Sequence, residues 1–591
     1  MTEAKKPKKA LFLKLLLRGG VIFLIGGSLG IFFLINQSRG NIKDSINFLE
    51  SFQFSKIEFQ RNLQDFKTDW QKWQRDVQIL LTKQSLGARI KYLYFLPQFK
   101  KESELKSNLL TIIKSGEQIA DGSVFKMMLN QEETLSFWEN FKKSLAYFDR
   151  YGINYFKDWH YHLDNWLSFF GVKQNKNYLV VFQDPSLPRP SGGLIEAYAI
   201  LSLNQGKVSL EGGSILDLKD AFLENIVPPL PLQTISNKWF FHDVNWFFDF
   251  PLTAQKTMAF YPATGEKEKL SGVIFVNLDF LREIIKITGP IEVKEYNLIL
   301  DENNFLSLFA QKTRESFKQV SATPSQEFFV FFLKALEEKM KTLPASALQP
   351  FPEIVMSAFN KKDIQLYNKE DGEEYYFDAF NWTGRLEESR GDYLGVAFSL
   401  LNKDFSADRR EKRLKLITDI SSGVKATTTL SISLSPEAVK EEDQELYLKI
   451  YLPQEAEIIE AKGGYLKNLN SKSWPYEKLG YKKDEDVFSI EATLKKFPGQ
   501  GIETYEESGK KVVGTWVRLG RSSFDLIYER PVGFDELNSW ELRVQKQSGQ
   551  NNKFFYQLIL PTGVKIAPTL FSFGQWLPLE KDLEINFNIE R

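Results

Sequence analysis

The segment YLVVFQDPSLPRPSGGLIEAYAILSL, residues Tyr178–Leu203, decides the fold of the central part of this chain. Two apolar runs, Tyr178–Gln183 and Leu194–Leu203, have the composition of buried strands. They flank a stretch rich in Pro, Gly and Ser, which predicts a turn. A sheet edge of this kind can offer backbone N–H groups and the Arg189 guanidinium to an anion. The predicted anion-binding residues are Arg189, Ser191, Gly192 and Gly193.

Residues 1–40 predict a membrane anchor. Basic residues precede an uncharged run, Gly19–Ile35, which with Leu15–Leu17 reaches roughly the 20 apolar residues that a helix needs to cross a bilayer. A cleaved signal peptide has a similar pattern, but residues 36–39 offer no small-x-small cleavage site, which favours an uncleaved anchor. Because the basic flank precedes the span, we expect a single-pass plasma-membrane protein with a cytoplasmic N-terminus and most of the chain extracytoplasmic.

Composition restricts the class of protein. A chain of 591 residues is too long for one core, so we expect two to four domains. Lys+Arg and Asp+Glu each number 76, which argues against nucleic acid as the main partner. The absence of cysteine excludes disulfides, thiolate metal sites and a cysteine nucleophile. The sequence also contains no Walker-type phosphate loop and no G-x-S-x-G motif.

Residues 41–171 predict a helical bundle or stalk. Apolar residues from Leu49 to Leu80 recur in steps of three and four, which indicates a helical seam. Further helical patterns lie near Glu102–Ala120 and in Glu132–Phe170. Three such helices can bury their apolar faces against one another. We prefer this bundle to the alternative, a coiled coil that binds a partner.

Residues 176–415 predict an α/β domain with a mixed sheet. Besides the strands around Arg189, a buried-strand pattern lies at Gly272–Val276, and helical patterns lie at Asp279–Ile287 and within Phe305–Lys341. Arg409–Arg413 has the charge pattern of a solvated helix face that leads into the next domain.

Residues 424–591 predict a β-sandwich, because short strand patterns alternate with Gly, Pro and Asn. The predicted strands are Thr427–Ser433, Glu445–Leu452, Lys511–Val517, Ser523–Tyr528, Trp540–Gln545, Phe554–Leu560 and Leu583–Ile589. No ligand set is visible in this segment. The whole chain is thus predicted to be a multidomain α+β protein with a transmembrane helix, a helical bundle, a central α/β domain and a C-terminal β-sandwich.

Four motifs, in this order, resemble the family called domain of unknown function 4012. They are YLVVFQDPSLPRPSGGLIEAYAIL from Tyr178, HDVNWFFDFP at His242–Pro251, SGVIFVNLDFLREIIKITGPIEV at Ser271–Val293 and GDYLGVAFSLLNKDFSADRR at Gly391–Arg410. The resemblance implies a membrane-anchored protein of the bacterial cell envelope. It does not by itself imply a reaction.

The order of strand, turn, strand, hairpin and GVIFVNLDFLREIIKITGPIEV is also more distantly similar to the LytR–CpsA–Psr family. Members of that family transfer glycopolymers from polyprenyl-pyrophosphate lipids to peptidoglycan. The resemblance implies arginines and carboxylates around a pyrophosphate. This chain departs from the pattern: it has Leu216-Asp217 where the family has an Arg-Asp pair, and Leu194 where the family has an arginine. Glu196 stands near a family aspartate.

Several polar residues could converge beside Arg189. Their carboxylates could hold Mg²⁺ at strand ends while Arg189 holds a phosphate. The alternative, which we prefer, is that Asp217 and Asp243 cap helices or turns and that Arg189 pairs with one of them. The candidate acidic cluster is Glu196, Asp217, Asp220, Asp243, Asn245 and Asp249.

Two functions follow from these patterns. The first is a non-catalytic envelope protein that binds a glycopolymer, a lipid carrier or a protein partner. The second is a phosphotransferase-like enzyme that moves a glycopolymer from a polyprenyl-pyrophosphate carrier to the cell wall. The enzyme requires a pocket that opens onto Arg189, and a buried ion pair of Arg189 would argue against it. The missing Arg-Asp pair favours the first function.

Overall fold

The computed structural model describes most of the chain from residue 174 to residue 590. The gaps are 205–206, 215–224, 262–268, 319–327, 344–346, 348–349, 390, 403–406, 436–443, 469–473, 519–522 and 567–572, and residues 165, 168, 169 and 171 are also described. The described residues within 177–201 and 210–591 form one compact unit. The predicted anchor and nearly all of the predicted bundle lie outside the described residues. Within the described residues, no helix combines the length and the apolar character needed to cross a membrane.

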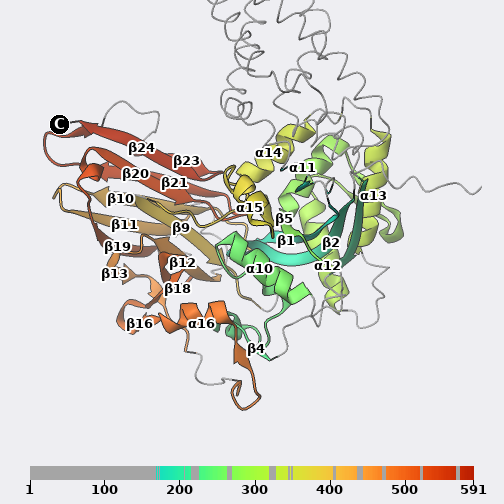
Figure 1. Ribbon diagram of the computed structural model, residues 1–591, viewed down its shortest axis with the longest axis horizontal. Helices are drawn as coiled ribbons and strands as arrows, with labels where there is room; N and C mark the ends of the chain where they lie inside the picture. Colours follow the sequence, from blue (N-terminus) through green and yellow to red (C-terminus); the bar gives the residue numbers. More distant parts are fainter. Residues whose placement is uncertain are drawn as a thin grey trace, which may run out of the picture. The chain divides into compact units, whose positions relative to one another are not determined.

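The predicted α/β segment contains a five-stranded sheet (Figure 1). Strand β1 pairs in parallel with β5, and β5 pairs antiparallel with β8, so the sheet is mixed, as predicted. β1 is buried along almost its whole length, which fits its continuous apolar character. The strands, in sheet order, are β3 (Lys207–Ser214), β2 (Gly192–Asn204), β1 (Lys176–Arg189), β5 (Gly272–Asn277) and β8 (Ile364–Asn368).

Helices surround this sheet (Figure 1). Helix α11 and strand β5 lie where the sequence predicted a helix and a strand. The helices are α10 (Phe250–Phe260), α11 (Leu278–Thr288), α12 (Phe305–Lys318), α13 (Phe328–Thr342), α14 (Phe351–Asn360) and α15 (Asp371–Asp378), and the 3₁₀ turns are η3 (Leu230–Thr234), η4 (Phe241–Asp243) and η6 (Lys294–Tyr296). Two short strand pairs are β6 (Ile291–Val293) with β7 (Leu298–Leu300), and β4 (Ile226–Val227) with β15 (Lys482–Lys483).

The C-terminal segment forms a six-stranded and a nine-stranded sheet, and all seven predicted strands are present. The first sheet, in order, is β13 (Glu457–Lys462), β19 (Phe524–Pro531), β11 (Lys425–Leu434), β10 (Lys412–Asp419), β21 (Asn552–Ile559) and β23 (Trp576–Leu579). The second is β16 (Lys495–Phe497), β17 (Ile502–Glu507), β18 (Lys510–Arg518), β12 (Glu445–Leu452), β9 (Asp392–Ser399), β20 (Ser539–Gln545), β24 (Leu583–Glu590) and β22 (Lys565–Ile566), with β14 (Gly464–Tyr465) beside β18. Helix α16 (Glu485–Ala492) and the turns η10 (Pro498–Gln500) and η11 (Asp535–Leu537) complete this part. Apolar side chains of both sheets share one core, as in a β-sandwich.

Two predictions at the boundary of the sandwich were wrong. Strand β9 lies within the predicted α/β segment and β10 begins in it, but both strands belong to the sandwich sheets. Arg409–Arg413 is not a solvated helix face, because β10 begins at Lys412 and both Arg410 and Lys412 are buried. Both side chains pair with Asp408, whose carboxylate lies 2.8 Å from Arg410 Nε and 3.4 Å from Lys412 Nζ.

The predicted turn around Arg189 is also shorter than expected. β1 continues to Arg189, and only Pro190 and Ser191 turn the chain into β2. The reason is tertiary: Leu187 and Leu194, near the end of this hairpin, pack in the apolar core of the sandwich. The hairpin therefore joins the five-stranded sheet to the sandwich within one compact unit.

Candidate functional site

Arg189 lies in a buried ion pair. Its side chain is 1% exposed, and its Nε lies 2.7 Å from Asp243 Oδ1. Its Nη1 donates hydrogen bonds to the carbonyl oxygens of Pro188 (3.0 Å) and Leu400 (2.8 Å). Burial acts to raise the pKa of Asp243, but Arg189 and His242 outweigh it and hold that pKa well below its usual range. We preferred this pairing of Arg189 with an aspartate on the basis of the sequence. The ion pair encloses the guanidinium that an anion site would need.

The other predicted anion-binding residues are buried in the same region. Ser191 Oγ donates to the carbonyl oxygen of Phe247 and lies 2.9 Å from Thr253 Oγ1. Gly192 has a φ of +144°, and a Cβ there would lie 1.9 Å from Gln183 Nε2. A Cβ on Gly193 would meet the backbone of Asp184. These glycines therefore permit close packing within the hairpin, and the loop does not present a row of free N–H groups to solvent.

The described members of the acidic cluster bind separate partners. Glu196 accepts a hydrogen bond from Thr313 Oγ1 (3.0 Å), and Asn245 Nδ2 donates to Gly193 O (2.6 Å). Asp249 accepts from the Leu386 N–H (2.8 Å). Asp217 and Asp220 lie outside the described residues. Among the residues that are described, no group of three or more Asp, Glu or His side chains could hold a metal ion.

A half-open pocket lies close to this network, beyond Trp246. Its walls come from the loop Pro229–Pro231, from Trp246 and Phe247, from β12 and β17, and from α16. The centres of water-sized molecules have about 40 Å³ of room in it, which is space for roughly three waters, since one water needs at least about 10–15 Å³. The pocket therefore has room for one small chemical group rather than for a whole ligand. The lining residues are Pro229, Leu230, Pro231, Trp246, Phe247, Tyr447, Lys449, Val487, Ile490, Glu491, Leu494, Glu503 and Tyr505.

Glu503 and Tyr447 form the polar wall of the pocket. Tyr447 OH donates to Glu503 Oε1 over 2.9 Å, although the two residues lie on strands separated by β18. Gly514 of β18 makes this possible, because a Cβ there would lie 2.4 Å from Tyr447 Oη. Burial raises the pKa of Glu503, and the hydrogen bond from Tyr447 opposes that shift. Glu491, on α16, lines the same pocket and also acts to raise the pKa of Glu503.

A buried ion pair lies beside this wall. Lys449 Nζ donates to Glu507 Oε2 (2.9 Å) and to the carbonyl oxygen of Trp246 (3.0 Å). Glu507 Oε1 accepts from Tyr451 OH (2.8 Å) and from the Phe248 N–H (3.2 Å). Burial lowers the pKa of Lys449, and the Glu507 carboxylate acts against this. Lys449 is thus paired with Glu507, and the carboxylates that line the pocket are Glu503 and Glu491.

Aromatic rings complete the pocket. The rings of Trp246 and Tyr447 are stacked, with centroids 6.0 Å apart, and Lys449 Nζ lies 4.9 Å from the Trp246 ring centroid. Rings beside carboxylates bind ligands that have both an apolar face and polar edges. Trp246 belongs to the HDVNWFFDFP motif, which the sequence had marked as polar groups among aromatic residues.

The pocket residues of the C-terminal segment were not predicted from the sequence. The signal was there: β12 reads ELYLKIYL, so Tyr447, Lys449 and Tyr451 share one face, while its leucines share the other. β17 reads IETYEE, which places Glu503, Tyr505 and Glu507 on one face. A strand with one apolar face and one face of Tyr, Lys and Glu covers a polar interior, but nothing in the sequence shows that these two faces meet.

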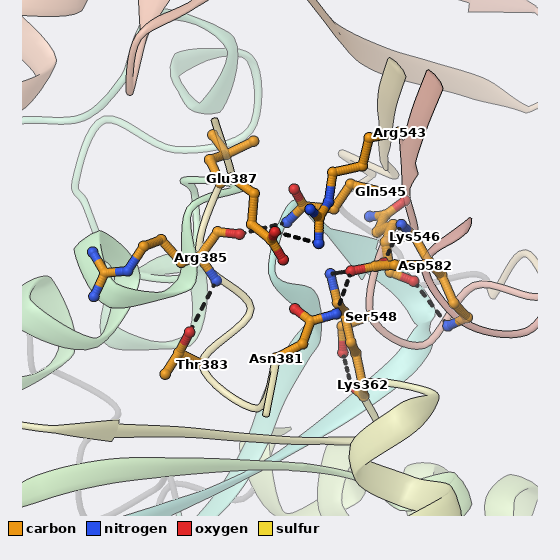
Figure 2. Close-up of polar contacts among 12 residues, drawn as sticks. Lys362, Asn381, Thr383, Arg385, Glu387, Arg543, Gln545, Lys546, Ser548 and Asp582 are labelled. Carbon is orange, nitrogen blue, oxygen red and sulfur yellow. Dashed lines mark hydrogen bonds and ion pairs between the residues drawn. The ribbon is translucent and has the colours of Figure 1, made fainter. Parts of the chain in front are cut away.

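A second buried polar cluster connects the segment before β9 with the segment after β9 (Figure 2). Lys362 Nζ lies 2.8 Å from Asp582 Oδ2, and the two side chains are 3% and 5% exposed. Asp582 also accepts from Asn381 Nδ2 (2.9 Å) and from the Lys546 N–H (2.7 Å). Burial acts to raise the pKa of Asp582, but Lys362 outweighs it, so the pKa is lowered. Burial also lowers the pKa of Lys546 to about 8, with Asp363 acting against it.

Figure 2 shows the same cluster continuing to Arg543 and Glu387, which are ion-paired. Gln545 Nε2 donates to the carbonyl oxygen of Arg385 over 2.9 Å, and Ser548 Oγ donates to that of Lys362. Each of these contacts links the segment before β9 to the segment after it. The side chains of this cluster pair with one another and with the backbone, and we assign it a structural role.

Comparison with known proteins places the central segment. No curated protein matches the chain. Residues 173–313, which contain β1, β2, β5 and α11, match the family model described as protein of unknown function, DUF4012. Over these residues the match confirms the family resemblance predicted from the motifs that begin at Tyr178, His242 and Ser271.

Proposed function

We propose that this chain is a non-catalytic binding protein of the bacterial cell envelope, held at the plasma membrane by its N-terminal segment, which binds an envelope glycan with the pocket around Glu503. The extracytoplasmic location rests on the sequence pattern of residues 1–40. The choice of a glycan rests on the pocket.

The observation that carries the proposal is that Trp246, Tyr447 and Glu503 line one cavity. A sugar presents apolar C–H groups that pack on rings, and hydroxyl groups that donate to carboxylates. The space of about 40 Å³ fits a hydroxymethyl or acetamido group, while the rest of the sugar would lie at the mouth. A pocket that buries one group of this size is suited to binding one unit of a longer polymer.

The alternative function, a glycopolymer phosphotransferase of the LytR–CpsA–Psr kind, has less support. It needs Arg189 to contact a pyrophosphate, and the guanidinium is enclosed and paired with Asp243. Releasing it would leave a buried carboxylate without its partner, which typically costs about 3–5 kcal/mol. Polyprenyl-pyrophosphate binding tests this alternative directly: equal binding by the wild type and by Arg189→Lys would remove it.

The glycan proposal is tested with a soluble disaccharide–peptide fragment of peptidoglycan, titrated against the full chain in detergent. Glu503→Gln keeps the size of the side chain and removes its charge. We expect the affinity to fall roughly ten- to a hundredfold, because a hydrogen bond to a charged group contributes about 1.5–3 kcal/mol. Glu529→Gln, on the far sheet, is the matched control and should bind like the wild type. Unchanged binding by Glu503→Gln in a folded protein would refute the proposal.

A further inference from the structure

The six-stranded sheet carries a pair of aromatic rings on its outer face. Side chains of β21 alternate between the core and the outside, and Phe554 and Tyr556 are the core members. Phe555, between them, therefore points outward. It stands opposite Trp576 of β23 in the register, with ring centroids 5.5 Å apart. Trp576 is 38% exposed, so the pair is open to a ligand.

The register of the sheet places three cations beside these rings. Lys415 of β10 is opposite Phe555, and Arg413 is opposite Lys553. The Arg413 guanidinium carbon lies 5.3 Å from the Trp576 ring centroid, and Lys415 Nζ lies 5.4 Å from that of Phe555. The register and both contacts put the five side chains on one surface. We call this surface the Trp576 face; it consists of Arg413, Lys415, Lys553, Phe555 and Trp576.

The cations of the Trp576 face outnumber the described carboxylates beside them. Glu411 lies 3.2 Å from Lys553 Nζ and 3.9 Å from Arg413 Nε, so one carboxylate serves two cations. Lys415 contacts Phe555 and is in none of the ion pairs formed by the described residues. Arg413 and Lys553 have like charge and stand directly opposite each other, an arrangement that is destabilising in a sheet. A further anion would relieve this repulsion.

Other described charges near the Trp576 face leave this excess in place. Asp525 is two strands from Lys415 in the same register row, and Asp419 is four residues farther along β10. These separations are roughly 10 Å and 13 Å, beyond the screening length of about 8 Å at physiological ionic strength. Glu580 and Lys581, which follow β23, are both exposed and have opposite charges.

We propose that the Trp576 face binds an acidic polysaccharide built from uronic acids, sugars that carry a carboxylate on the ring. The apolar C–H groups of such a sugar pack on Trp576 and Phe555, and its carboxylate pairs with Arg413 or Lys415. The cations lie 5.3 and 5.4 Å from the ring centroids. The stacked ring and the bound anion must therefore belong to the same sugar, which fits a uronic acid better than a phosphate in a linker between sugars.

Other occupants fit the Trp576 face less well. Docking on a bilayer needs a broad apolar surface, whereas three of the five side chains here are cations. The cores of protein interfaces are depleted of lysine, and two of these cations are lysines. The inference does not rest on the glycan pocket, because Glu503 lies on β17 of the nine-stranded sheet.

The test titrates the full chain in detergent with a hexamer of galacturonic acid, and with cellohexaose as a neutral hexamer of similar length. Lys415→Gln removes the unpaired charge, and Trp576→Leu removes the exposed ring but keeps an apolar side chain. The matched control is Lys425→Gln, which changes an exposed lysine on β11 of the same sheet. Circular dichroism shows that each variant is folded.

We expect the wild type and Lys425→Gln to bind the acidic hexamer roughly tenfold more tightly than the neutral one. Lys415→Gln should lose most of this preference, and Trp576→Leu should weaken the binding of the acidic hexamer several-fold. Equal affinity of the wild type for the two hexamers would overturn the proposal. A loss with Lys415→Gln but none with Trp576→Leu would also overturn it, because attraction between charges alone would then explain the binding. A loss with Glu503→Gln and none with either variant of the Trp576 face would assign the acidic hexamer to the pocket and overturn the proposal.

Discussion

The ion pair between Lys449 and Glu507 makes the sharpest prediction about what holds the pocket together. Both side chains are almost completely buried, at 3% and 0% exposure. We consider Glu507→Gln, which keeps the shape of the side chain and removes its charge. Lys449 would then stay in the interior without a counter-charge, although it would retain the hydrogen bond to the Trp246 carbonyl oxygen.

The expected loss can be bounded from these contacts. Breaking one partner of a buried ion pair costs about 3–5 kcal/mol. The contact of Lys449 Nζ with the Trp246 ring persists in the variant and leaves the buried charge one favourable neighbour, so we expect a loss at the lower end of this range. We therefore expect Glu507→Gln to lower the free energy of unfolding by about 3 kcal/mol. Replacing both charges, with Lys449→Met and Glu507→Gln together, should recover most of the loss, because no charge is then left uncompensated.

Urea unfolding of the full chain, followed by tryptophan fluorescence, measures these differences. The control is Glu529→Gln, which removes the charge partner of the exposed Lys425 and should leave the unfolding midpoint unchanged. A loss below about 1 kcal/mol for Glu507→Gln would refute the argument, because a buried unpaired charge costs more than that. A double variant as unstable as the sum of the two single variants would refute it as well, because the losses would then not arise from pairing.

Three further predictions concern the same unit. Gly514→Ala should cost about 1–3 kcal/mol by overpacking and should weaken glycan binding, because its Cβ would displace Tyr447 from Glu503; thermal unfolding and titration check this. The pKa of Asp243 is lower in the folded protein than in the unfolded chain, so the ionised carboxylate stabilises the fold. This stabilisation is present above the unfolded pKa of about 4 and is lost as the pH falls through the folded pKa. Asp243→Asn should therefore flatten the acid limb of a stability–pH profile. Burial raises the pKa of Asp249 to about 6, so stability should fall as the pH rises from about 4 to about 6, and Asp249→Asn should remove that fall.

Local patterns predicted the strands and helices well and failed where distant contacts decide. β5 and α11 formed where apolar periodicity placed them, and so did the strands of the sandwich. The predicted turn between Gln183 and Leu194 is shorter than expected, because Leu187 packs in a core supplied by residues far along the chain. A Pro-rich stretch predicts a turn only when no sheet or core holds it extended.

In the candidate site, too, local patterns predicted some contacts, and contacts between distant residues were missed. The sequence singled out Arg189 and Asp243 as a potential pair, and it is one. It did not indicate that Leu400 closes over the guanidinium, since that contact spans more than two hundred residues. The pocket depends on Gly514, a residue whose function is to have no side chain between Tyr447 and Glu503. Such a role has no sequence signature of its own.

The buried cations explain why the pocket lies where it does. Arg189 reaches Leu400, Lys449 reaches Trp246 and Lys362 reaches Asp582, and each contact joins the segment before β9 to the segment that contains the sandwich. Apolar contacts would hold these two segments together at least as strongly, because desolvating charges is costly. Apolar contacts, however, permit sliding, whereas a charged group has few positions in which it is satisfied. The pocket takes Trp246 from one segment and Glu503 from the other. Its shape therefore depends on the relative position of the two segments, which the buried charges fix. We infer that apolar replacement of the Lys362–Asp582 pair would preserve stability and still weaken ligand binding, which separates the positioning role of the buried charges from their energetic one.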